Sequence, residues 1–486
     1  MNRQLVQIMF KRKICWLIVL LAGFKTQAQV GTDSSAVFTL QQCVELAIRN
    51  NVDVQKKGLA KESAHINLQQ SRGNLLPSLN ADIVHGSNQG RSVDPYSNSY
   101  IDQQYTYANY GLNSSVTLFN GGALQNSIRQ NRSAYEASAM EEQQLKDNTT
   151  LNVILVYLQI LTNEDLLTLA VQQQATSGKQ VERLDILNKD GAANPNELYD
   201  LKGTYANDQV NVVTTRNNLN NAKLSLCQLL NIPYNKNIKV QRLPESQMPL
   251  LYDATSEQVY QNAEKNLAII KAVDLRKESA SQGVKVAKGT GFPTLYLSGG
   301  LYSTYSSVAA MQELMSKSYQ PNGDYVTVGG SNLPVMSEKS VYNSNKISYG
   351  SQLSNNLNTS VSIGLKLPIL NGFSNKNKIA QARILQKDAE ITAKSTHIQL
   401  EQNVEQAYFN MTASQDKFQV LQLQQTAFQE SFRIAEVKFN AGAITSVDYL
   451  IAKNNSDKSN INFVVAKYDL IIRNKVLDYY QGKQLW

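Results

Sequence analysis

The chain has 486 residues, of which 42% are hydrophobic and 18% charged, so it is long enough for several domains and able to bury a core. Residues 1–28 hold five of the 47 Lys and Arg residues and none of the 39 acids, which leaves 42 bases against 39 acids in the rest. This small surplus excludes the concentrated basic face that nucleic-acid binding requires.

The N-terminal segment predicts export. Basic residues precede an apolar run at 14–24, which is too short to cross a bilayer of about 30 Å but fits the core of a secretory signal. Small residues at Thr26 and Ala28 place the expected cleavage after Ala28, so residues 1–28 are predicted to be a signal peptide. The alternative is an N-terminal helix that stays on the chain.

Two cysteines, Cys43 and Cys227, belong to the predicted mature chain. An exported protein can pair such residues, but two cysteines far apart in the sequence do not decide between a disulfide and free thiols. Cys15 lies inside the predicted signal, and no cysteine directly follows the apolar run to accept a lipid.

An internal repeat organises the remainder into copies at about 38–231 and 255–482, joined by a proline-containing linker at 232–254. After a shift of 216 residues, the segment Lys-Glu-Ser-Ala at 61–64 recurs at 277–280. After a shift of 251 residues, Asn-Gly at 120–121 recurs at 371–372, so the second copy carries an insertion of 35 residues. Copies of this size are too long for solenoid units and predict a duplicated domain.

Each copy predicts, in chain order, a helix, a strand, a loop, a second strand, a long helix, a tip and a further helix. In the first copy the shorter helices are expected at about 39–74 and 195–230, stacked end to end beside the long one. The long segments 123–190 and 373–441 contain no proline and, between them, a single glycine, Gly178. Each predicts a rod of about 100 Å.

The second long segment also predicts a coiled coil, because apolar residues recur at intervals of seven. These residues are Ile384, Ile391, Ile398, Val404, Met411, Phe418, Leu421, Phe428 and Ala435.

Four short segments near 79–86, 112–119, 295–302 and 359–367 alternate apolar and polar residues and predict strands. This alternation is typical of a membrane barrel wall around a wet lumen, and equally of a half-buried soluble sheet. The segments 87–111 and 303–358 are predicted to be loops rich in Ser, Asn, Gly and Tyr. Tyrosines near strand ends favour the membrane interpretation, since the ring is apolar and the hydroxyl seeks water.

Turn residues mark the predicted corners between helices and strands. Proline stops a helix because it lacks the amide donor, and glycine accepts the positive φ of a sharp turn. The corner residues are Pro77, Asn120, Gly121, Pro293, Asn371 and Gly372.

These features resemble the TolC-like outer-membrane efflux family over nearly all of the predicted mature chain. The resemblance is carried by the opening FTLQQCVELA at 38–47 with Asn50-Asn51, the prolines before the strands, LFNGG at 118–122, and KFNAG at 438–442 followed by DYL at 448–450. Each motif is short and unspecific alone, whereas their order, duplication and spacing are specific.

The resemblance implies a homotrimer with a 12-stranded β-barrel in the outer membrane of a Gram-negative bacterium, continued by a 12-helix α-barrel in the periplasm. It implies an exit duct of a tripartite efflux or type I secretion system, exporting small molecules or peptides. The implied partners are a periplasmic adaptor and an inner-membrane pump that supplies the energy. Independently, four strands cannot close a barrel and lipid does not tolerate open sheet edges, so several chains must combine. The alternative is a periplasmic coiled-coil adaptor or scaffold that never enters the membrane.

The resemblance also implies a periplasmic gate near the second tip. Positions that match the family's constriction carry Phe439, Ile444 and Asp448, and Glu197 stands at the position of an acid whose basic partner is replaced by Ile444. We expect a gate closed mainly by apolar contacts of Phe439 and Ile444, with Asp448 giving a modest preference for cations.

Helix capping is the alternative role for the two acids. Asn194 and Thr445 fit helix N-caps, so Glu197 and Asp448 would lie in first turns and complement the helix dipoles.

The two tips are expected to contact the adaptor through Gly191, Ala192, Gly442 and Ala443. In the alternative interpretation, each glycine merely ends a helix in the left-handed conformation.

No enzyme is predicted. His65, His85 and His397 share no metal-ligand spacing, and KGTGFP at 288–293 is similar to a phosphate loop but lacks the Lys-Ser/Thr pair and the following helix. We therefore expect neither catalytic residues nor a metal or cofactor.

Overall fold

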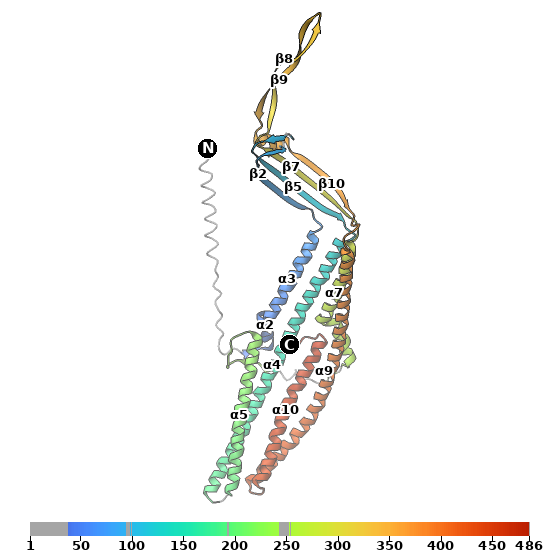
Figure 1. Cartoon of the computed structure of the whole chain (residues 1–486). Coiled ribbons are helices and arrows are strands. Elements are labelled where there is room, and N and C mark those ends of the chain that lie inside the picture. The colour runs from blue at the N-terminus through green and yellow to red at the C-terminus, as the bar shows by residue number, and fades with distance from the viewer. Residues whose placement is uncertain are drawn as a thin grey trace.

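Figure 1 shows the computed structural model, an elongated molecule with helices at one end and strands at the other. The structure describes residues 37–93, 98, 100–191, 194–242, 252 and 254–485. The predicted signal peptide and the tip residue Ala192 lie outside the described residues.

Two helices of 67 residues each run the length of the helical region, α4 (Ala123–Lys189) and α9 (Ser374–Asn440). At about 1.5 Å per residue, each is about 100 Å long. The predicted rods are therefore confirmed.

Four shorter helices pack in pairs along the two rods (Figure 1). Both α3 (Val52–Gly73) and α5 (Pro195–Leu230) lie against α4, whereas α7 (Ala268–Gly289) and α10 (Ser446–Tyr480) lie against α9. Because α4 also contacts α7 and α10, the helices form a wall of four columns in the order α3/α5, α4, α7/α10, α9.

The helix that opens each copy is divided, contrary to the prediction of one helix over 39–74. Helix α2 (Leu40–Asn50) meets α3 at Asn51, and α6 (Ser256–Asn266) meets α7 at Leu267. Asn51 has an extended backbone, and its side chain accepts hydrogen bonds from the amides of Asp53 and Val54. This asparagine ends one helix and caps the next.

Four antiparallel strands form one sheet at the end of the wall, in the order β10-β7-β5-β2. These strands are β2 (Ser78–Asn88), β5 (Tyr105–Phe119), β7 (Thr294–Ser306) and β10 (Asn358–Lys366). Strand β2 follows α3, β5 leads to α4, β7 follows α7 and β10 leads to α9. The sheet order thus repeats the column order, and β2 and β10 are its two edges.

The segments predicted as loops contain further strands, so that part of the prediction is wrong. A small pair, β3 (Arg91–Val93) and β4 (Tyr100–Asp102), follows β2, and a long hairpin of β8 (Ala310–Val328) and β9 (Ser331–Lys346) precedes the short helix α8 (Tyr349–Asn355). Main-chain pairing holds these strands, and nearly all their residues are exposed, so their sequence shows no buried face for periodicity to reveal.

The corners use the predicted residues. Gly121 and Gly372 have φ of +65° and +60°, the left-handed region that favours glycine. Pro77 and Pro293 directly precede β2 and β7. A Cβ on Gly121 would lie 2.7 Å from the carbonyl oxygen of Gly289, so this corner also needs glycine for close packing.

The main core lies midway along the wall, where α2 packs on α4 and α5. By length and composition α4 contains a window apolar enough to cross a membrane, but its most apolar part, 151–161, contributes Val153, Tyr157 and Leu161 to this core. Beside it, β1 (Val37–Phe38) pairs in parallel with β6 (Lys239–Val240), and the Tyr157 hydroxyl donates to the Gln241 carbonyl at 2.6 Å.

Cys43 and Cys227 are both buried in this core as free thiols. Burial, and secondarily the neighbouring Cys227, raises the pKa of the Cys43 thiol to about 12. The structure therefore favours free thiols over the disulfide.

Candidate functional site

The edge column α9 leaves a long apolar row unpartnered within the chain. Ile384, Ile391 and Ile398 are exposed, whereas α9 buries Leu400, Val404 and Met411 near its middle. The predicted seam is thus exposed from Ile384 to Ile398, buried at Val404 and Met411, and half-buried from Phe418 to Ala435. Further exposed apolar residues along α9 are Leu385, Phe409, Val420, Leu423, Ile434 and Val437.

The opposite edge of the wall, formed by α3 and α5, is open in the same way. Leu59 and Ile66 on α3 and Tyr199, Val210 and Val213 on α5 are exposed. Both edges of the wall therefore expose more apolar side chains than the single, scattered ones that are normal on a protein surface.

The sheet has one apolar and one polar face. On β10, Val361, Ile363 and Leu365 are 76, 69 and 60% exposed. The residues between them face the other way, and there the hydroxyls of Ser362 and Ser298 bond across β10 and β7 at 2.8 Å. An apolar outer face backed by a polar face is the pattern of a membrane strand beside water.

Polar side chains are linked across the polar face of the sheet. The Tyr302 hydroxyl donates to Asn113 Oδ1, and Asn113 Nδ2 donates to Asp82 Oδ2 at 2.9 Å, so the chain of bonds crosses β7, β5 and β2. Asp82 and Lys366 are the only charged side chains on this face of the four strands. The surface is therefore wettable and nearly neutral.

At the far end of the wall, one apolar cluster joins the two helical tips. Phe439 on α9 is 5% exposed and stacks on Tyr449 of α10 with ring centroids 4.6 Å apart. Leu198 and Leu201 on α5 belong to the same cluster, and Ile444 packs against it. The structure thus brings Phe439 and Ile444 together, in contacts within one chain.

The two acids predicted for the gate lie in first turns of helices. Thr445 accepts from the Asp448 amide at 3.2 Å and its hydroxyl donates to Asp448 Oδ2 at 2.9 Å. Asn194 accepts from the Asn196 amide at 3.1 Å, and Glu197 is in the first turn of α5. The predicted N-caps are confirmed, and the Asp448 carboxylate remains exposed.

Gly191 and Gly442 end the long helices with φ of +74° and +72°. At the second tip, the Ala443 amide donates to Lys438 and the Gly442 amide to Phe439, which are the paired bonds of a Schellman motif. The helix-ending role of these glycines is therefore confirmed, and Ala443 is left exposed beside it.

Sequence reasoning missed Arg183, which ties the two tips together. Its guanidinium donates to Asn440 Oδ1 and to the Asn440 carbonyl, both at 2.6 Å, and lies over the Phe439 ring at 5.9 Å. An arginine among many polar helix residues gives no signal of its partner, because the partner comes from the other copy.

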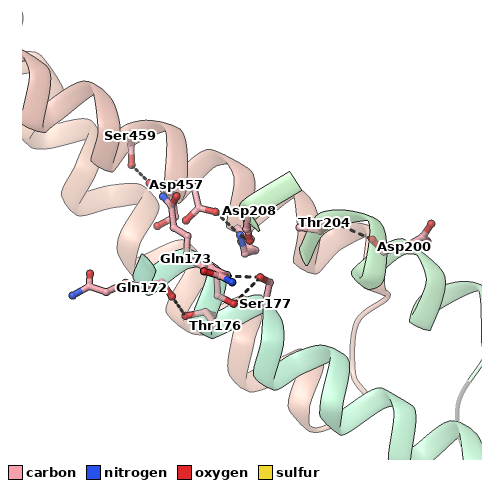
Figure 2. Close-up of polar contacts among 12 residues, drawn as sticks. Gln172, Gln173, Thr176, Ser177, Asp200, Thr204, Asp208, Asp457 and Ser459 are labelled. Atoms are coloured by element: carbon pink, nitrogen blue, oxygen red, sulfur yellow. Dashed lines mark hydrogen bonds and ion pairs between the residues drawn. The ribbon is translucent and has the colours of Figure 1, made fainter. Parts of the chain in front are cut away.

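A buried ion cluster above the tips was also missed. Lys453 on α10 is 1% exposed and donates to Asp208 of α5 at 3.0 Å and to Asp457 at 2.6 Å. Figure 2 shows these two carboxylates among hydroxyl and amide side chains of α4, α5 and α10, including Gln173 and Ser177. Burial raises the pKa of Asp457, and the bond from Lys453 acts against that shift. The cluster fastens the second copy to the first.

Comparison with known proteins extends these observations. The family model described as "Outer membrane efflux protein" matches residues 43–231 and 259–482. The chain is 22% identical to the outer membrane protein TolC of Salmonella enteritidis over 478 residues, which cover 95% of this chain and 84% of that protein.

Solved structures share the architecture at low identity. CusC superimposes with a TM-score of 0.72 at 15% identity, covering 92% of each chain. The outer membrane protein VceC of Vibrio cholerae superimposes with a TM-score of 0.71 at 14% identity, covering 92% of this chain and 97% of that one. These likenesses concern the fold.

Proposed function

From the premise that the chain belongs to the outer membrane efflux protein family, we propose that it forms one third of a trimeric exit duct. Membership places the protein in the outer membrane of a Gram-negative bacterium, extending into the periplasm, as the channel component of an efflux system. In the proposed duct, three copies form a closed ring with twelve strands in the membrane and twelve helical columns in the periplasm. Each copy contributes four strands and four columns.

The proposal rests on one observation: the two unpaired edges of the sheet lie on the same two sides of the chain as the two uncovered edges of the helical wall. Edge strand β2 continues the column of α3, and edge strand β10 continues the column of α9. In lipid, the unpaired amides and carbonyls of both edge strands must find partners. A neighbouring copy that pairs its β2 with β10 also brings its α3 and α5 beside α9, which covers both apolar sides.

The number of copies follows from the size of the lumen. Two copies would give eight strands, and the interior of an eight-stranded barrel is filled by side chains or holds one small ligand. Three copies are the smallest closed assembly that leaves an open duct. The polar face with Asn113 and Ser298 then lines the lumen, and the face with Val361, Ile363 and Leu365 contacts lipid.

At the periplasmic end, the proposed gate is the cluster that joins the two tips. Phe439 and Ile444 hold the tips of one copy together, and three copies place the exposed Asp448 carboxylates around the mouth, with Glu197 beside the first tip. A ring of like charges raises the local concentration of cations. Asp448 caps its helix and supplies this field at once.

The tips around Gly191 and Gly442 are proposed to receive a periplasmic adaptor, because they are the ends of the rods farthest from the sheet (Figure 1). Ala443 is exposed at the second tip, and its small side chain permits close approach; Ala192 is the corresponding residue of the first tip in the sequence. An inner-membrane pump would supply the energy and the cargo, small molecules or peptides, in a tripartite efflux or type I secretion system. A soluble adaptor or scaffold would leave the apolar face of the sheet unexplained.

Outer-membrane extraction followed by planar-bilayer recording tests the proposal. The protein purified in detergent should migrate as a compact oligomer until boiled and should then conduct ions in discrete steps. Recovery of the protein as a soluble periplasmic species without conductance would contradict the duct and favour the scaffold.

A further inference from the structure

Three tyrosines lie on the polar face of the sheet, which lines the lumen of the proposed duct. Tyr107 stands six residues from Asn113 along β5, and Tyr296 and Tyr302 stand two and four residues from Ser298 along β7. Because the side chains of a strand alternate between its faces, these even spacings put all three tyrosines on the face of Asn113 and Ser298. Aromatic rings are therefore built into the side of the sheet that faces water in the duct.

Each of these rings leans along the wall, because the residue beneath its hydroxyl end is a glycine. A Cβ on Gly86 would lie 2.7 Å from Cζ of Tyr107, and a Cβ on Gly364 would collide with the ring of Tyr296. Tyr296 and Tyr302 are 39 and 43% exposed, so the ring surface away from the sheet stays open to a solute. The three pairs of tyrosine and glycine are Tyr107 with Gly86, Tyr296 with Gly364 and Tyr302 with Gly300. The rings thus line the lumen without standing across it.

A hollow on the same face adjoins Tyr296 where the sheet meets the helices. Its volume is about 460 Å³, within the range of about 300–1,000 Å³ that is usual for small-molecule sites. Among the residues that the structure describes, no charged side chain lines it, and Lys366, which pairs with Thr294 across the strands, is not a lining residue. The lining residues that bear hydroxyl groups are Ser78, Ser115, Thr117, Thr294 and Tyr296. An ionised solute would find no counter-charge in the hollow.

The wall beside the rings offers hydrogen bonds instead of charge. Asn113 accepts from the Tyr302 hydroxyl, and the hydroxyls of Ser298 and Ser362, one row from Tyr296, lie 2.8 Å apart. Hydroxyl and amide side chains can each donate and accept hydrogen bonds. A solute that itself carries many hydroxyl groups therefore finds partners along the wall.

We propose that this wall is a weak binding track for uncharged sugar rings, with its tightest station at the hollow beside Tyr296, and that the duct passes neutral saccharides. This inference rests on the proposed duct and names a class of cargo for it. A pyranose ring has a face of C–H groups and a rim of hydroxyl groups. The C–H face suits the electron-rich face of a tyrosine ring, and the rim suits serine, threonine and asparagine side chains.

A purely structural role is the alternative, because an aromatic ring over a glycine also stabilises the strand that carries the glycine. In that case the rings would cover the sheet and have no affinity for a solute. The two roles differ in what happens when a ring is removed from an assembled duct that still conducts.

Planar-bilayer recording of the purified trimer with maltohexaose, a neutral oligosaccharide, separates the two roles. Interruptions of the current give the dissociation constant of the sugar, and polyethylene glycol of similar mass controls for blockage by size alone. Tyr296→Leu and Tyr302→Leu remove rings, and Tyr296→Phe keeps the ring without its hydroxyl. Tyr305→Leu is the matched change on the opposite face, where Tyr305 packs on Tyr349 with ring centroids 4.4 Å apart. Heat-modifiable migration and the single-channel conductance show that each variant has assembled.

We expect the dissociation constant of maltohexaose to rise about two- to tenfold in Tyr296→Leu, as for the loss of one aromatic contact, and to rise less in Tyr302→Leu. Tyr296→Phe and Tyr305→Leu should stay close to the parent, and polyethylene glycol should act equally on all of them.

A maltohexaose effect no larger than that of polyethylene glycol, or one unchanged in Tyr296→Leu, would overturn the proposal and leave the duct standing. Stronger interruption by a planar aromatic cation such as ethidium, lost in the same variants, would assign the rings to charged cargo and overturn it equally. Absence of any conductance in the parent would overturn both this proposal and the duct.

Discussion

The rods α4 and α9 have the same length and the same place in their repeats, yet they are buried to different extents. Eighteen residues of α4 are buried, against six of α9. Helix α4 has columns on both sides, α3 and α5 on one and α7 and α10 on the other. Among the helices of the described part of the chain, α9 packs against α7, α6 and α10, which all belong to the second copy.

The difference is what the proposed trimer predicts, because a neighbouring copy would cover the open side of α9. If both rods served the same role in isolation, α9 would have replaced its apolar row with polar residues, as exposed helix faces normally do. It keeps Ile384, Ile391 and Ile398 exposed instead. The sheet repeats the pattern, since β5 and β7 are paired on both sides and β2 and β10 are edges.

The largest expected effect concerns β10, the edge strand above α9. Replacing Ile363 and Leu365 by arginine should cost about 2–4 kcal/mol for each residue near the bilayer midplane. Outer-membrane insertion, measured by fractionation, should be lost. The matched pair Ser360→Arg and Ser362→Arg lies on the polar face and should still insert; equal behaviour of the two pairs would remove the distinction between the faces.

The buried joint between the two copies should give the next largest effect. Lys453→Met leaves Asp208 and Asp457 without their cation, which should destabilise the helical region by about 3–5 kcal/mol. Thermal unfolding in detergent, followed by circular dichroism, measures this. The double variant Lys453→Met/Asp208→Asn should recover part of the loss, whereas a single variant as stable as the parent would show that the cluster holds nothing together.

The pH dependence of the Lys453→Met defect has a defined sign. Burial raises the folded-state pKa of Asp457 above its ordinary value of 3.8, so the folded chain holds this proton more tightly than the unfolded chain. The contribution of Asp457 to stability therefore falls as the pH rises from 3.8 through the folded-state pKa. Without the lysine, stability should fall more steeply as the pH rises. The difference in free energy of unfolding between Lys453→Met and the parent should therefore be smaller at acidic pH than at neutral pH.

The features of the fold and of the site that could be predicted from the sequence are those determined by residues close together in the chain. The rods, the corners at Gly121 and Gly372, and the caps Asn194 and Thr445 follow from spacing and turn chemistry, which act within a few residues. The break at Asn51 was missed because its cap competes with a continuous helical pattern. Lys453 and Arg183 were missed because their partners lie 245 and 257 residues away in sequence.

A smaller effect tests the open side of α9 directly. Ile391 is 58% exposed in one chain, so Ile391→Ala should change stability by less than about 0.5 kcal/mol if this side stays open. If a neighbouring copy covers Ile391, the assembly should lose at least about 2 kcal/mol of stability for each interface between copies. Dissociation on dilution in detergent distinguishes the cases. Val404→Ala, at a site buried within the chain, is the control whose effect should not depend on protein concentration.

The smallest expected effect compares the two tips. Asp448→Asn keeps a side chain of similar shape in the first turn but removes the proposed ring of charge, so cation preference in planar-bilayer recordings should fall by less than about tenfold. Glu197→Gln is the matched change at the first tip. Identical ion selectivity in the parent and in Asp448→Asn would leave Asp448 as a helix cap alone.

The central claim is that the β2 and β10 edges of neighbouring copies meet, and linking those edges tests it most directly. Asn80 on β2 and Ser360 on β10 share one row across the sheet of one chain through Asn113 and Gly300. Because the strands of a closed barrel are staggered, the two positions are offset along the strands between neighbouring copies, so the linker must be long and flexible. A chain with Asn80→Cys and Ser360→Cys is treated with bis-maleimide in outer membranes, and the denatured products are weighed by mass spectrometry. We predict a series of masses that ends at three chains. Single chains only, or a series that continues past three, would contradict the account.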